Sequence, residues 1–310
     1  MSDDTLRQFL EVQAHFNLPS VALVEKDVHV LRAIRALLAV DAAPFTLVFG
    51  GGTALARAHK LVQRMSEDVD FKIVPTPAAP VSRSGLHRQR SALRDRVTTA
   101  LQAAGFAFDP KDAVRSRDES SYTIFQLPYT AGGAGEGLRP TIQIELQHAT
   151  LRLPRVTLPV SSFIAEALNR APEVPAIACM NVTETAAEKL VSLTRRTAMD
   201  LAGLSRDFDP ALVRHIYDLH VLRDHVDRGT VIALARDIAA ADSDEFRNQY
   251  PAYHTDIAGE THKALDALRT DPVHRLRYDR FLAIMVYGEQ VEFDDAMGTI
   301  FNLVNDTWQS

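Results

Sequence analysis

The sequence has a single cysteine, Cys179, and no long run of uncharged apolar residues. One cysteine excludes an internal disulfide, and a chain without about twenty consecutive apolar residues is not expected to cross a membrane as a helix. The N-terminus, MSDDTLRQFLEVQ, is acidic and amphipathic and lacks the basic and apolar parts of a signal peptide. We therefore expect a cytoplasmic protein.

A surplus of basic residues is also missing. The formal net charge is −6 over 310 residues, whereas proteins that hold long nucleic acids by bulk charge are usually basic. Any nucleic-acid contact must therefore use a local patch. Helical spacing puts Arg83, His87, Arg90 and Arg94 on one face and an apolar stripe on the other. Taken alone, this arginine face is more typical of a solvated surface than of a groove for phosphates.

The composition is that of a globular protein, with 46% apolar and 24% charged residues, and its patterning divides the chain into two parts. Apolar spacing predicts helices at 5–15, 21–40, 52–61 and 83–104 and strands at 46–50, 68–74, 121–129, 140–149 and 156–160. A glycine-rich turn at 131–137 predicts a hairpin. Helical periods then dominate, at 161–169, 183–204, 209–224, 228–241, 256–268, 273–288 and 292–308. We predict an α+β fold with an α/β domain over 1–160 and an α-helical domain over 161–310.

Three glycines and a threonine precede a helix-like run in FGGGTALARAHKL, residues 49–61. The N–H groups at a helix N-terminus form a natural site for phosphate. Gly51, Gly52 and Thr53 are therefore candidates for nucleotide binding, and a simple tight turn is the alternative.

Carboxylates alternate on the strand that follows. In DVDFKIV, strand geometry puts Asp68 and Asp70 on one face and the apolar residues on the other. Glu145 lies on the polar side of TIQIELQ, so the three acids converge if these strands are neighbours. Such acids repel one another unless a cation lies between them, and Mg²⁺ or Mn²⁺ suits oxygen ligands. Ordinary solvent-facing acids are the alternative.

The order of these features resembles the DNA polymerase beta-like nucleotidyltransferase superfamily and, more closely, the AbiEii/AbiGii-type nucleotidyltransferase toxins. The resemblance is carried by VEKDVHV (24–30), FGGGTALARAHKLVQRMSEDVDF (49–71), EKLVSLTRR (188–196) and RHIYDLHVL (214–222), in the order of the family. It implies a polymerase-beta-like sheet with flanking helices, followed by a helical domain that completes the active-site cleft.

The resemblance also implies roles for residues of the first half. Ser66, Asp68 and Asp70 would bind metal and nucleotide, and Glu145 would be the third catalytic, metal-binding acid. Arg64 would lie near the nucleotide phosphates, with a surface salt bridge as the alternative.

In the second half, Lys189 matches the helical lysine of the family, and Asp218 matches the acid of its terminal motif, which could orient Lys189 or a substrate hydroxyl. Arg196 shares a helix face with Lys189, and both could contact a triphosphate; pairing on a solvated surface is the alternative. Residues 25–27 are interpreted as ties between the N-terminal helix and the core, and a role in the site stays open for them.

The implied activity is transfer of a nucleoside monophosphate from an NTP to an acceptor hydroxyl, with RNA, and the tRNA 3′ end in particular, as acceptor. The protein would be a toxin countered by a separate antitoxin. Arg83, Arg90 and Arg94 would line the acceptor groove. Three alternatives stay open: nucleotidyl transfer to a small molecule or a protein, phosphoryl transfer, and a catalytically silent nucleotide- or protein-binding member of a toxin pair.

Overall fold

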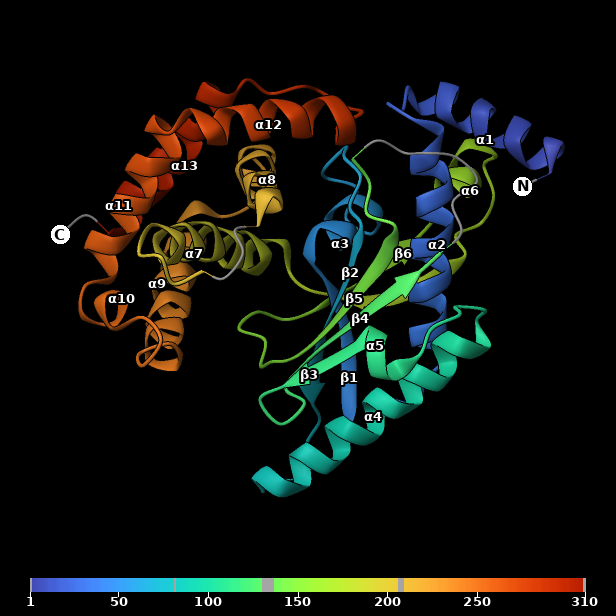
Figure 1. The fold of residues 1–310 in the computed structure, drawn as a ribbon, viewed down its shortest axis with the longest axis horizontal. Helices are drawn as coiled ribbons and strands as arrows, with labels where there is room; N and C mark the ends of the chain where they lie inside the picture. The colour runs from blue at the N-terminus through green and yellow to red at the C-terminus, as the bar shows by residue number, and fades with distance from the viewer. Residues whose placement is uncertain (1, 81, 130–136, 206–208, 309–310) are drawn as a thin grey trace. The chain divides into compact units, whose positions relative to one another are not determined.

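The computed structural model describes residues 2–80, 82–129, 137–205 and 209–308. The chain falls into two compact units, Met1–Met180 and Asn181–Ser310. The first contains a mixed sheet with helices, and the described part of the second is helical (Figure 1). The predicted α+β fold is confirmed.

The strands of the first unit form one sheet in the order β3-β4-β5-β2-β1-β7-β6. β2 runs parallel to β5, and β1 runs parallel to β7, whereas the other neighbours are antiparallel. The strands are β1 Phe45–Gly50, β2 Asp68–Pro75, β3 Val114–Arg117, β4 Tyr122–Pro128, β5 Thr141–His148, β6 Val156–Val160 and β7 Val174–Cys179.

The antiparallel pairing of β4 with β5 confirms the predicted hairpin, although most of its predicted turn, 131–136, lies outside the described residues. The sequence did not predict β3 or β7. β3 is an edge strand without an apolar face, and β7 contains a proline, so neither shows a clean alternation. Because β7 pairs with β1 and β6, residues 161–180 belong to the first unit, and the two units divide at Met180 rather than near residue 160.

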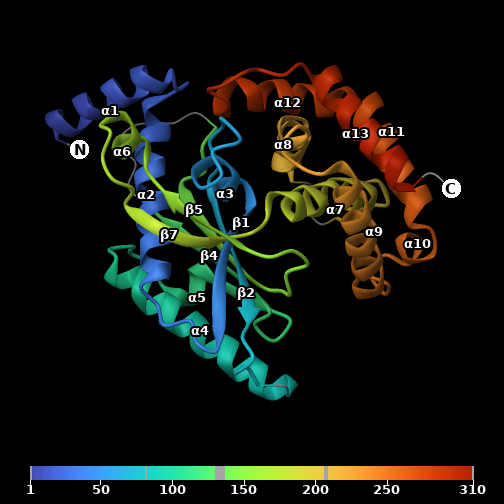
Figure 2. The same cartoon turned by 180° about the vertical axis from the view of Figure 1, so that it is seen from behind.

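Helices pack against one face of this sheet. The described helices of the first unit are α1 Asp3–Phe16, α2 Val21–Leu38, α3 Gly51–Arg57, α4 Arg83–Ala103, α5 Pro110–Ala113 and α6 Phe163–Ala167. α2 packs against β2, β5 and α4, and both long helices flank the sheet in Figures 1 and 2. The buried residues Val69, Phe71 and Ile73 alternate along β2 and form the apolar face of the sheet.

A buried ion pair joins α2 to the start of β2. Nζ of Lys26 lies 3.0 Å from Oε1 of Glu67, and both side chains are almost fully buried. Lys26 also donates hydrogen bonds to the backbone carbonyls of Arg139, at 2.5 Å, and Thr141, at 2.8 Å. Burial lowers the pKa of Lys26, and the Glu67 carboxylate opposes this shift.

The next residue of α2 makes a second tie. Oδ1 of Asp27 lies 2.8 Å from Nε of Arg57 in α3, and Oδ2 accepts the backbone N–H of Phe163 at 2.7 Å. Burial raises the pKa of Asp27, and the Arg57 guanidinium opposes this shift. The interpretation of residues 25–27 as ties to the core is therefore confirmed for Lys26 and Asp27.

The second unit consists of packed helices in its described part. α7 lies against α8, α9 and α11. Asn181, Asp227, Asp256 and Asp271 each accept a backbone N–H at the start of a helix, which explains where these helices begin. The elements are α7 Val182–Leu201, the 3₁₀ turn η1 Pro210–Val213, α8 Arg214–Leu222, α9 Arg228–Glu245, α10 Pro251–Thr255, α11 Ile257–Thr270, α12 Pro272–Met285 and α13 Phe293–Trp308.

Of the helices that the structure describes, none combines the length and apolar character needed to cross a membrane.

The buried pair yields a stability test. We expect Lys26→Met to lower the free energy of unfolding by about 3–5 kcal/mol, because Glu67 would keep its buried charge without the ammonium group. The matched control is Lys60→Met, whose pair with Glu166 is largely exposed and contributes at most about 1 kcal/mol. Urea unfolding followed by circular dichroism measures both. Equal losses in the two variants would contradict the role given to Lys26, and adding Glu67→Gln should recover part of the loss.

Candidate active site

The pairing of β2 with β5 brings the three predicted acids onto one face of the sheet. Asp70 is the register partner of Glu145, and Asp68 is the partner of Gln143. Register partners on neighbouring strands point to the same side, and the apolar residues of both strands are buried on the other side. The two strands are thus neighbours, as the sequence argument required.

Two of these carboxylates are engaged by polar partners. Nη2 of Arg139 donates to Oδ1 of Asp68 at 2.6 Å. The hydroxyl of Tyr122 donates to Oε2 of Glu145 at 2.7 Å, and the amide of Gln143 donates to its Oε1 at 2.6 Å. Positive charge and hydrogen bonds therefore relieve the repulsion between acids that a cation was expected to relieve.

The predicted three-carboxylate metal cluster is not assembled. In the described part of the chain, no three acidic, histidine or cysteine side chains are placed to hold a metal ion together. The acids are engaged by other side chains instead: Tyr122 and Gln143 donate to Glu145, and Arg139 donates to Asp68.

The hydroxyl of Tyr122 remains a hydrogen-bond donor at neutral pH. Burial and the adjacent Glu145 carboxylate raise the pKa of Tyr122, because both disfavour a phenolate. Tyr122 therefore fixes the orientation of Glu145 without adding negative charge to the site.

The glycines after β1 make room for side chains of the site. A Cβ atom on Gly51 would overlap the carboxylate of Asp70, and the φ angle of Gly51 is +67°. A Cβ atom on Gly52 would lie 2.5 Å from Nη2 of Arg64 and 2.8 Å from Oγ of Ser66. The spaces at both glycines are therefore filled by predicted site residues. Asp70, Arg64 and Ser66 lie against the start of α3 as a result.

Gly51 and Gly52, at the start of α3, form what we call the glycine corner. The other residues of this segment are buried and support this corner. Thr53 is 1% exposed, and its hydroxyl donates a short hydrogen bond to the backbone carbonyl of Asp68. Arg64 is 2% exposed and donates to the carbonyl of Met65 at 2.9 Å. The alternative of a surface salt bridge for Arg64 is therefore wrong.

The donor set fits a hard divalent cation. Mg²⁺ usually takes one or two protein carboxylates and leaves its other positions to water and substrate phosphates. Asp68 and Asp70 supply two such carboxylates on one side of β2, and the side chain of Asp68 is 26% exposed. Asp68 and Asp70 are therefore the candidate metal ligands, whereas Glu145 is already bound by the chain itself.

The predicted residues of the second unit form two ion pairs. Nζ of Lys189 in α7 lies 2.8 Å from Oδ2 of Asp218 in α8, and Asp218 is fully buried. Arg196 pairs with Asp209 at 2.9 Å instead. Nδ1 of His215 donates to the backbone carbonyl of Lys189 at 3.2 Å. Burial together with the nearby Lys189 ammonium lowers the pKa of His215 well below the usual range. Asp218 therefore orients Lys189, one of the two roles that the resemblance implied.

The arginines of α4 do not form the shared exposed face that the spacing predicted. Arg90 is 7% exposed, whereas Arg83 pairs with Glu119 at 2.8 Å and Arg94 pairs with Asp95 at 2.7 Å.

α4 also packs on the face of the sheet opposite the carboxylates. Burial and the charge of Arg90 lower the pKa of His148, and His148 is the register partner of Ile73 on the apolar face. The helix therefore presents Arg90 to the wrong side of the sheet for a groove beside Asp68 and Asp70.

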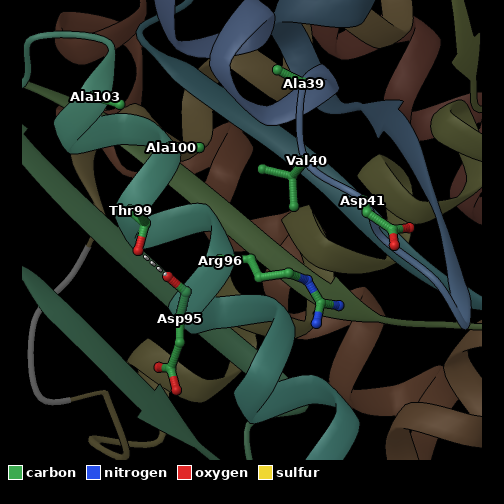
Figure 3. Close-up of a pocket in the computed structure, with 8 residues that line it drawn as sticks. All are labelled: Ala39, Val40, Asp41, Asp95, Arg96, Thr99, Ala100 and Ala103. Atoms are coloured by element: carbon green, nitrogen blue, oxygen red, sulfur yellow. Dashed lines mark hydrogen bonds between the residues drawn. The ribbon is translucent and has the colours of Figure 1, made fainter.

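An open pocket of about 440 Å³ lies on this α4 side (Figure 3). Asp95, Arg96 and Thr99 of α4 line it together with residues 39–41, which follow α2. It shares no lining residue with the carboxylate face, so we assign it no part in the site.

Sequence reasoning missed Glu67, Tyr122 and Arg139. Glu67 is adjacent to Asp68 and could have been noted as a second acid of the SEDVD segment. Tyr122 shows the alternation of its strand, but only the register with β5 puts it beside Glu145. No local pattern marks Arg139, whose backbone N–H donates to Glu67 and whose guanidinium reaches Asp68.

Known proteins resemble the chain in sequence and in fold. A family model described as the nucleotidyl transferase AbiEii toxin of the type IV TA system matches residues 32–299. The structure is similar to that of MenT4, a nucleotidyltransferase toxin from Mycobacterium tuberculosis H37Rv, with a TM-score of 0.54 over 97% of this chain and 90% of that chain. The two chains are 17% identical, so this likeness shows the fold alone. No curated protein matches the sequence.

The position of Asp70 against Gly51 can be tested by adding one methyl group. Gly51→Ala and Gly105→Ala both place alanine at a positive φ, which costs about 1–2 kcal/mol. Only Gly51 also faces a clash, since nothing lies within 4 Å of a Cβ atom on Gly105. We expect Gly51→Ala to lose about 1–3 kcal/mol more than Gly105→Ala in urea unfolding, as for other overpacked positions. Losses of equal size would show that Asp70 does not lie over Gly51.

Proposed function

Because the chain belongs to the AbiEii family of nucleotidyl transferase toxins of type IV toxin–antitoxin systems, we propose that it transfers a nucleoside monophosphate from an NTP to the 3′ hydroxyl of an RNA, with tRNA as the favoured acceptor. Membership of the family makes the protein a nucleotidyltransferase with an NTP substrate and an antitoxin partner. The metal, the acceptor and the site residues are the proposed parts. The same proposal puts its action in the cytoplasm, where both NTP and tRNA are found.

One observation carries the proposal: Asp68, Asp70 and Glu145 share one face of two neighbouring strands, directly beside the glycine corner that holds Asp70. Arg139 balances Asp68, and Tyr122 and Gln143 hold Glu145, but acids that need such partners have no packing role on a polar face. Their placement is explained if they handle a cation and a reacting hydroxyl.

Asp68 and Asp70 would hold a divalent metal ion, Mg²⁺ or Mn²⁺. When bound, such an ion neutralises negative charge on substrate phosphates. Arg139, which lies on Asp68, would then be available to the phosphates of the NTP, for which a guanidinium is well suited.

Glu145 would accept the proton of the acceptor. The acceptor hydroxyl attacks the α-phosphorus, its O–H proton passes to the Glu145 carboxylate, and the bond from that phosphorus to the bridging oxygen breaks. Pyrophosphate leaves with the electrons of that bond, and the nucleoside monophosphate stays on the acceptor. Tyr122 and Gln143 orient the Glu145 carboxylate for this step.

The glycine corner would bind the nucleotide. Gly51, Gly52 and Thr53 begin α3, and Arg64 and Ser66 lie against Gly52. Ser66 would offer a hydroxyl and Arg64 a positive charge to the nucleotide. In the helical unit, nucleotide binding by Lys189 and Arg196 stays a prediction of the resemblance, supported by the ion pair that orients Lys189 on Asp218.

The test uses purified protein, Mg²⁺, a total tRNA pool and each of the four α-³²P-labelled NTPs. We expect label in RNA with the wild type and a loss of at least about a hundredfold with Asp70→Asn. The matched control is Asp112→Asn, an exposed acid of the same unit, which should keep full activity. Circular dichroism of each variant separates loss of activity from loss of fold.

Other outcomes would replace parts of the proposal. Label in RNA from γ-³²P-NTP but not from α-³²P-NTP would mean phosphoryl transfer. No label in RNA would reject RNA as acceptor, and the same assay with cell extract would then favour a protein or a small molecule.

Arg139 allows the proposed metal site to be tested without any reaction. We expect Arg139→Gln to tighten Mn²⁺ binding by on the order of tenfold, because the variant removes a positive charge from Asp68. Electron paramagnetic resonance measures free Mn²⁺ directly. Arg155→Gln, at an exposed arginine away from Asp68, is the matched control and should leave binding unchanged. If Arg139→Gln also leaves it unchanged, the metal does not bind at Asp68.

A further inference from the structure

The face of the sheet that carries Asp68, Asp70 and Glu145 is its open face. This face also carries arginines that follow the acids from strand to strand through the backbone register. Backbone register connects Arg115 of β3 to Ile124 of β4, Ile124 to Glu145 of β5, and Glu145 to Asp70 of β2. These four residues therefore form one row on one face of the sheet. With a strand spacing of about 4.8 Å, the row from Arg115 to Asp70 spans roughly 14 Å.

A second row runs beside the first and is basic at both ends. It connects Arg117 to Tyr122, Tyr122 to Gln147 and Gln147 to Lys72. The guanidinium of Arg117 lies over the ring of Tyr122 at 4.6 Å, and Nζ of Lys72 donates to Gln147 at 2.8 Å. Since Tyr122 donates to Glu145, Arg117 is in contact with a residue that orients the proposed proton acceptor.

Both arginines are exposed on the outer strand. β3 is the last strand of the sheet and pairs only with β4 within the described residues, and residues 115–117 are exposed. In the described part of the chain, neither guanidinium is paired with a carboxylate, whereas Arg83 and Arg94 of α4 are each held by one. Arg115 and Arg117 therefore bring positive charge without an acidic partner to the carboxylate side of the sheet, in a protein whose net charge is −6.

Phosphates of a nucleic-acid strand fit this arrangement. A guanidinium binds a phosphate through two parallel hydrogen bonds. The two strand spacings from Glu145 to Arg115, roughly 10 Å, correspond to about three nucleotides at about 3.4 Å each along one strand. A strand whose terminal hydroxyl lies beside Glu145 would thus have its upstream phosphates over β3.

We propose that Arg115 and Arg117 on the edge strand β3 bind the phosphates of the acceptor RNA a few nucleotides upstream of its reacting 3′ end. This inference rests on the proposed function, because it takes the 3′ hydroxyl to react at Glu145. It replaces α4 as the acceptor-binding surface. Charged residues also protect edge strands from pairing with other molecules, and this general role requires no RNA.

The test is direct RNA binding without NTP or metal. The probe is an RNA hairpin with a four-nucleotide single-stranded 3′ tail and a 5′ fluorophore, and anisotropy is measured over a series of salt concentrations. The variant combines Arg115→Gln with Arg117→Gln, and the matched control combines Arg83→Gln with Arg94→Gln on α4. We expect the β3 variant to bind at least tenfold more weakly, with a salt slope smaller by about 1.4, since each phosphate contact on a single strand contributes about 0.7. The α4 variant should bind like the wild type.

A kinetic readout distinguishes RNA binding from chemistry. In the label-transfer assay, we expect the β3 variant to raise KM for RNA while the KM for NTP stays unchanged, because the arginines contact the acceptor only. A fall in kcat with no change in either KM would overturn the proposal. If the glutamine variant aggregates, Arg115→Glu with Arg117→Glu keeps charged side chains on the edge strand, and an unchanged affinity for RNA in that variant would also overturn the proposal.

The outcomes also separate this inference from the proposed function. If the wild type labels RNA but the β3 variant binds the hairpin with wild-type affinity and salt slope, only the assignment of β3 is wrong. Equal weakening by the β3 and α4 variants would mean a bulk charge effect and would reject the assignment too. If the wild type neither binds the hairpin nor labels any RNA, both fail together.

Discussion

The ammonium group of Lys26 holds the polar face of the sheet in its arrangement. It lies in α2, pairs with buried Glu67 and donates a hydrogen bond to the backbone carbonyl of Arg139. Glu67 in turn accepts the backbone N–H of Arg139, so the position of Arg139 is set from two sides. The guanidinium of Arg139 then neutralises Asp68. A charge buried beneath the sheet thus determines how an acid on its open face is balanced.

The glycine corner complements this network by leaving space. At Gly51 and Gly52 the missing side chains admit Asp70, Arg64 and Ser66. The chain therefore satisfies the corner with its own groups and keeps the carboxylates close to the start of α3. A nucleotide would meet a corner already organised by hydrogen bonds, which lowers the reorganisation needed for reaction.

Charge is divided between the two faces of the sheet. On the apolar side, Arg90 is buried against the sheet, and Arg83 and Arg94 of α4 are paired with acids. On the open side, Arg115 and Arg117 lie in line with and beside the acids, and neither is paired with a carboxylate among the described residues. An overall negative charge therefore does not prevent a local surface for phosphates, provided that the basic groups lie on the face that carries the acids.

The sequence alone determined most of the element types, the family and the faces on which residues of one strand lie. Alternation in DVDFKIV and TIQIELQ, and the glycines before α3, are local patterns that extend over a few residues. Tertiary structure decided the rest: which strands are neighbours, that Arg139 lies on an acid 71 residues away, and that α4 packs on the opposite face from the carboxylates. Register and long-range ion pairs depend on packing between distant segments, and a local period contains no information about them. For the same reason the arginines of edge strand β3, which has no apolar alternation, became candidates only through their register with Glu145 and Asp70.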